Sequence, residues 1–101
     1  MLNEILKMGV CEGRHERVFL KKDGHFFGTL SSEEMKNPTL LKELGVKKLM
    51  EYGDFSVIHI YATNNFVANL AAIEAAKELK KTIVVMHYDR VEGAFYPQKV
   101  A

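Results

Sequence analysis

The chain has 101 residues, of which 48% are hydrophobic, and its 14 basic and 13 acidic side chains give a formal net charge of +1. This length predicts a single domain, residues 1–101, that can bury a core but has little stability to spare. The balanced charge argues against nucleic-acid binding, which needs a concentrated basic surface. The apolar runs fall short of the ~18 residues that cross a bilayer, so a membrane partner is not expected.

The single cysteine, Cys11, has no second cysteine in the chain with which to form a disulfide. Nothing therefore indicates an oxidising compartment. Residues 1–17 also lack the long apolar core of a signal peptide. We expect a cytoplasmic protein, in which the role of Cys11 stays open. Frequent lysine and glutamate beside a single glutamine, Gln98, favour a heat-adapted source.

The first thirty residues predict a short helix followed by a β-hairpin. Residues 2–8 (LNEILKM) place apolar side chains at mostly helical spacing, and Gly9 would end that helix. Residues 16–30 combine β-favouring residues on both sides of the dipeptide Asp23-Gly24, a strong hairpin-turn signal. We therefore expect an N-terminal β-hairpin.

Two helical segments are predicted next. Ser31, followed by serine and two glutamates, is typical of a capped helix start. Pro38 predicts the start of a second segment, which we expect to end at Gly45, because glycine commonly follows the last helical residue. Residues 46–52 could be helical or could pair with the strand that follows, and their composition favours helix.

The segment 55–88 predicts a βαβ crossover, because two runs rich in β-branched residues flank one helix. Its parts are a strand over 55–61, a helix over 65–80 and a strand over 82–88. A last strand over 94–100 contains Pro97, which confines it to a sheet edge. The fold class is therefore α/β or α+β, with a mixed sheet of about four or five strands and helices packed on it.

The helix at 65–80 has more apolar surface than one face of a sheet can cover. Between residues 66 and 73 the sole polar side chain is Asn69. Either the segment 38–52 covers this surface or a second copy of the chain does, and we expect a homo-oligomer through residues 66–73. Leu70 and Ile73 are expected in the core.

Asn64 and Asn65 lie where the first strand of the crossover gives way to its helix. The carboxyl ends of parallel strands and the free amides of a helix start favour anions, so a small ligand or anion could bind there. The favoured alternative is capping of the helix by asparagine. The turn contains no glycine, so a dinucleotide or P-loop site is not expected there. No cofactor is expected for the chain.

Histidines on both crossover strands could form a second candidate site. If the faces of the two strands coincide, His59 and Tyr61 lie beside His87 and Asp89. His59, His87 and Asp89 would then suit a transition metal, or a base with its orienting acid. Arg90 could pair with an anion held at the same end. The favoured alternative is that each histidine has a structural role.

These observations favour a self-associating, non-catalytic binding module without a cofactor. The alternative is a small enzyme or metal-binding protein that uses the histidine cluster. A nucleic-acid-binding protein ranks third, because the net charge is close to zero.

Overall fold

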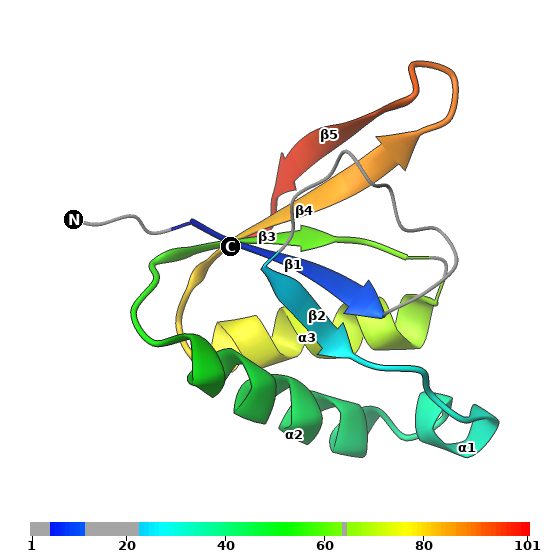
Figure 1. The fold of residues 1–101 in the computed structure, drawn as a ribbon, viewed down its shortest axis with the longest axis vertical. Helices are drawn as coiled ribbons and strands as arrows, with labels where there is room; N and C mark the ends of the chain where they lie inside the picture. The colour runs from blue at the N-terminus through cyan, green and yellow to red at the C-terminus, as the bar shows by residue number, and fades with distance from the viewer. Residues whose placement is uncertain (1–4, 12–22, 64) are drawn as a thin grey trace.

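The protein is a mixed sheet of five strands with helices packed on one face (Figure 1). The computed structural model describes residues 5–11, 23–63 and 65–101. The elements are β1 (Ile5–Cys11), β2 (Gly24–Phe27), α1 (Ser32–Met35), α2 (Pro38–Leu49), the short 3-10 helix η1 (Met50–Tyr52), β3 (Val57–Tyr61), α3 (Phe66–Glu78), β4 (Thr82–Asp89) and β5 (Ala94–Lys99). The strand order is β2-β1-β3-β4-β5, and only the β4–β5 pair among these strands is antiparallel. The predicted α/β class and the β3–α3–β4 crossover are confirmed.

The core lies between the sheet and the helices α2 and α3. Every second residue of the central strands points into it, because side chains alternate between the two faces of a strand. These residues are Leu6, Met8, Val10, Ile58, Ile60, Ile83 and Val85. They form one buried cluster with Leu41 and Leu49 of α2 and with the alanines of α3.

Helix α2 approaches α3 closely, and Gly45 is the residue that permits it. A Cβ at Gly45 would lie 2.9 Å from the Cβ of Ala75 on α3 and 3.4 Å from Cδ1 of Phe26. The prediction that the helix ends at Gly45 is therefore wrong, since this glycine serves helix packing. The chain stays helical through α2 and η1, which confirms the helical prediction for residues 46–52.

The predicted helix over residues 2–8 is also wrong, since residues 5–11 form strand β1 between β2 and β3. Leu6, Met8 and Val10 are buried at alternate positions, which is the period of a strand. Gly9 does not end the element but pairs with Tyr61 of β3 in mid-strand.

The predicted hairpin over residues 16–30 is described only in its second arm, which is β2, and its first arm lies outside the described residues. β2 pairs in parallel with β1. Asp23 fixes the start of this pairing: its main-chain N–H donates to the Lys7 carbonyl at 2.7 Å, and its carboxylate accepts the Lys7 N–H at 2.8 Å.

The start of α1 and the position of β5 at the sheet edge are both determined by residues close in sequence. Ser31 forms a capping box with Glu34 at the start of α1, as its sequence predicts. β5, which contains Pro97, is an edge strand, also as predicted. The β4–β5 hairpin projects beyond the body of the sheet (Figure 1). Among the described residues, no helix is long and apolar enough to cross a membrane.

Candidate functional site

An anion site was one possibility for the loop between β3 and α3. In the structure, the side chains of Asn65 and Asn69 make hydrogen bonds to the main chain of this loop and of the first turn of α3. The Asn65 side chain caps α3 by accepting the Ala68 N–H at 3.0 Å. Asn69 accepts the Thr63 N–H at 3.0 Å and donates to the Thr63 carbonyl at 2.8 Å. Asn64 lies outside the described residues. The favoured interpretation of Asn65 as a helix cap therefore agrees with the geometry.

Asp89 closes the turn between β4 and β5. Its Oδ1 atom accepts the N–H of Val91 at 2.9 Å and that of Glu92 at 3.2 Å. Its main-chain carbonyl accepts the Gly93 N–H at 2.8 Å. Arg90 is exposed in the same turn. The carboxylate proposed as a ligand thus organises a hairpin, as Asp commonly does in turns.

The histidine cluster is not assembled, because His59 and His87 lie on opposite faces of the sheet. In the β3–β4 register His59 is paired with Val84, and His87 is three residues further along β4. An odd offset reverses the face. His87 instead contacts β5, with its Nε2 2.7 Å from Oε1 of Gln98 and its ring stacked 5.3 Å from that of Tyr96. Within the described chain, no three His, Cys, Asp or Glu residues are grouped to hold a metal.

Among the described residues, no helix packs on the sheet face opposite α2 and α3, which is called here the open face. Three basic side chains lie on this face in one register row that crosses four strands. Lys7 of β1 pairs with His59 of β3, His59 with Val84 of β4, and Val84 with Lys99 of β5. Lys7, His59 and Lys99 are called here the cation row. Both lysines are exposed and His59 is half-buried. Desolvation by burial, and secondarily the Lys7 charge, lower the pKa of His59, so at neutral pH its imidazole is mainly uncharged and the charge of the row is that of Lys7 and Lys99.

An aromatic cluster lies further along the same face. The Phe95 ring of β5 meets Tyr61 edge-on, with centroids 5.0 Å apart, and lies 5.1 Å from the Tyr88 ring. Burial raises the pKa of the Tyr61 hydroxyl. Tyr61 is thus a packed residue, whereas Phe95 and Tyr88 keep part of their surface.

The paired strand residues of the open face carry no carboxylate, although the Asp23 carboxylate accepts the Lys7 main-chain N–H at 2.8 Å beside one end of the row. The members of this face on β1, β3, β4 and β5 are Ile5, Lys7, Gly9, Val57, His59, Tyr61, Thr82, Val84, Met86, Tyr88, Phe95, Pro97 and Lys99. Their charge is therefore of one sign, although that of the whole chain is nearly balanced. Such a local field favours an anionic ligand.

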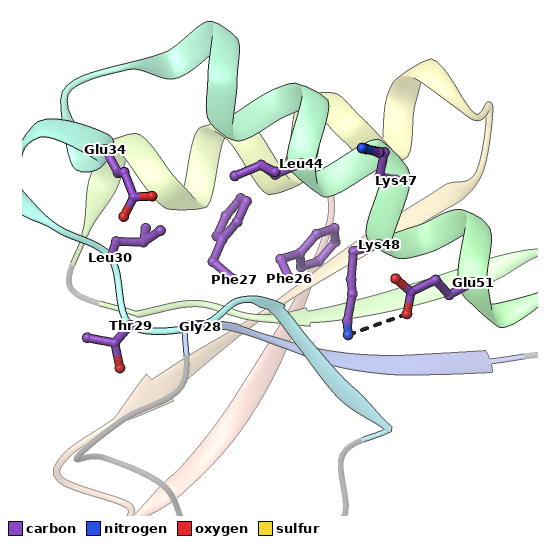
Figure 2. Close-up of a pocket in the computed structure, with 10 residues that line it drawn as sticks. All are labelled: Phe26, Phe27, Gly28, Thr29, Leu30, Glu34, Leu44, Lys47, Lys48 and Glu51. Carbon is purple, nitrogen blue, oxygen red and sulfur yellow. Dashed lines mark ion pairs between the residues drawn. The ribbon is translucent and has the colours of Figure 1, made fainter.

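A hollow, which no sequence pattern indicated, lies between β2 and α2 (Figure 2). It has a volume of about 410 Å³ and an apolar wall that includes Phe26, Phe27 and Leu44. Two lysines and two glutamates also line it, and one such pair, Lys48 and Glu51, lies 3.5 Å apart. Its charges are balanced, so it has no preference for an anion.

Cys11 ends β1 and is half-buried. Burial raises the pKa of its thiol. The thiol is therefore protonated at neutral pH, and the thiolate, which is the reactive form, is depleted. This environment suits a packed cysteine better than a nucleophile.

Helix α3 turns its alanines inward and leaves larger apolar side chains outside. Its fully buried residues are Ala68, Ala71, Ala72, Ala75 and Ala76. Phe66 is 71% exposed and Leu70 is 43% exposed. The expected core position of Leu70 is therefore wrong, whereas Ile73 packs against the core while partly buried. α2 covers the alanine side of α3, but an apolar pair one turn apart stays in solvent.

Comparison with known proteins gives no match: no protein-family model, no curated protein and no solved structure matches this chain. Functional inference therefore depends on the residues and geometry of the chain itself.

Proposed function

We propose that this protein is a small, non-catalytic binding module that takes an anionic ligand on the open face of its sheet. The carrying observation is the cation row, in which Lys7, His59 and Lys99 lie in register with no carboxylate among the paired residues of that face. Several of the candidate polar residues have structural partners instead. Asn65 caps a helix and Asp89 closes a turn.

A thermal-shift experiment tests the ligand class. Anything that binds the folded state and not the unfolded state raises the melting temperature by mass action. We expect polyvalent anions such as polyphosphate to raise the melting temperature of the wild type, and Lys7→Gln to lose most of that rise. A wild type indifferent to every anion would refute the proposal.

The module is also proposed to self-associate through residues 66–73 of α3. Phe66 and Leu70 lie on consecutive turns, so they form one outward apolar spot. Fully burying such a side chain contributes about 1.5–3 kcal/mol, so their exposed fractions correspond to about 2–3 kcal/mol per subunit. A symmetric dimer would double this to about 4–6 kcal/mol, which offsets only the lower range of the association cost of about 4–15 kcal/mol. We therefore expect a weak, concentration-dependent dimer.

Sedimentation velocity over a wide range of protein concentration measures this equilibrium. Phe66→Glu should shift the population to monomer, because a charge would be buried in the contact. Met50→Glu is the matched control, since Met50 is 68% exposed on η1, outside α3. A wild type that is monomeric at every concentration would remove self-association from the proposal.

We further propose a cytoplasmic location and a heat-adapted source. The single cysteine and the scarcity of glutamine support these two assignments.

A further inference from the structure

We infer that the open face binds single-stranded nucleic acid, with phosphates at Lys7 and Lys99 and bases resting on the apolar side chains beside them. This inference rests on the proposed anion-binding function and names its ligand. It does not depend on self-association, because α3 lies on the opposite side of the sheet (Figure 1).

The geometry of the cation row suits an extended backbone of phosphates. The row crosses from β1 through β3 and β4 to β5, which is three steps between neighbouring strands. At about 4.8 Å per step, the row spans about 14 Å. Lys7 and Lys99, at its two ends, are both exposed. A chain lying across the strands would therefore meet a cation where it enters the sheet and another where it leaves.

The surface beside the row is apolar, which favours bases over a bare polyanion. Two residues further along the strands, or roughly 7 Å away, the paired side chains on β4 and β5 are Met86 and Pro97. Two residues beyond these is Phe95, paired with Tyr88. Pro97 is exposed and Met86 and Phe95 are partly exposed. Nucleic-acid bases stack on such surfaces, and aromatic stacking contributes much of the affinity for single strands.

A duplex is a poorer fit than a single strand. Its base faces are stacked inside the helix, so they cannot lie on Met86, Pro97 and Phe95. Only the phosphate contacts would remain, and these are few on this face. We therefore expect a preference for single strands over a duplex of the same length.

Fluorescence anisotropy with a labelled oligothymidylate and a labelled oligouridylate tests the inference. We expect both single strands to bind at low salt, and a hairpin duplex and inorganic polyphosphate to compete less well. Lys7→Gln and Lys99→Gln should each weaken binding severalfold and reduce the slope of log affinity against log salt by about 0.7, the value for one phosphate contact to a single strand. Phe95→Leu should weaken binding without changing that slope.

The control is Lys36→Gln, which removes the same charge from an exposed lysine between α1 and α2. It should leave affinity and slope unchanged. A thermal melt of each variant verifies that it is folded. The inference is overturned by a lack of binding at low salt, by an equal effect of Lys36→Gln, or by polyphosphate competing as well as the oligonucleotides. In the last case the anion site would stand while its assignment to nucleic acid would fail. Phe66→Glu should bind normally, which separates this test from that of self-association.

Discussion

The substitution Gly45→Ala tests how closely α2 and α3 are packed. Gly45 is buried in the middle of α2, and its hydrogen faces Ala75. In an ordinary helix, replacing glycine by alanine stabilises by about 0.5–1 kcal/mol, because glycine loses more backbone freedom on folding. The expected sign here is the opposite.

The magnitude follows from the space available. The new Cβ would lie 2.9 Å from the Cβ of Ala75 and 3.4 Å from Cδ1 of Phe26. Carbon atoms pack best at about 3.5–4.0 Å. The Ala75 Cβ is attached directly to backbone and cannot rotate away, so the helices must separate. Overpacking of this kind costs about 1–3 kcal/mol. After the helix-propensity gain is subtracted, we expect a net loss of about 1 kcal/mol.

Urea unfolding of a double-mutant cycle isolates the contact. In an Ala75→Gly background the clash is gone, so Gly45→Ala should stabilise by about 0.5–1 kcal/mol. Gly28→Ala is the control for a glycine with open space, since nothing lies within 4 Å of its added Cβ. If Gly45→Ala stabilises the wild type as much as it does the Ala75→Gly background, the close approach of the two helices does not limit the fold.

Three further predictions concern single side chains. The folded-state pKa of His59 lies below its unfolded value, so the unfolded state binds more protons in acid; the free energy of unfolding should fall as the pH drops through about 6.5. His59→Gln should flatten that pH dependence in urea midpoints, and identical profiles would refute the assignment. Asn65→Ala should cost about 0.5–2 kcal/mol through the lost cap without altering anion binding; a changed anion response would place the ligand at the helix start. Leu41→Ala should cost about 2–5 kcal/mol, because Leu41 is fully buried, whereas Leu70→Ala at a 43% exposed position should cost much less; equal unfolding midpoints would show that α3 is rotated from its described phase.

Local chemistry was enough to place most elements of this fold. The capping serine at position 31 and the asparagine at position 65 satisfy the first free amides of their helices, and this depends on neighbours within one turn. The two runs rich in β-branched residues on either side of α3 predicted the parallel crossover, because such runs favour strands and two strands joined through one helix form a parallel pair. Pro97 predicted an edge strand, because it cannot donate a hydrogen bond to a further strand.

The structural roles of two glycines depended on contacts with residues distant in the chain. Gly9 and Gly45 both follow apolar residues at helical spacing, and both were interpreted as helix ends. Gly9 lies within a strand between two others, and Gly45 lies where one helix touches another. The local pattern is the same in both cases. Only the tertiary contacts distinguish a glycine that ends a helix from one that lies within a strand or at a helix–helix contact.

The candidate site depended on strand register, which local sequence does not specify. A shift of one residue in the β3–β4 pairing would have placed His59 and His87 on one face. The observed register separates them and instead aligns His59 with Lys7 and Lys99, which are far apart in the chain. The net charge of +1 averages over all surfaces and therefore conceals this row. Pairing of the strands gathers cations on one face because register is set by burial of the opposite face, where Ile58, Ile60 and Ile83 must reach the core.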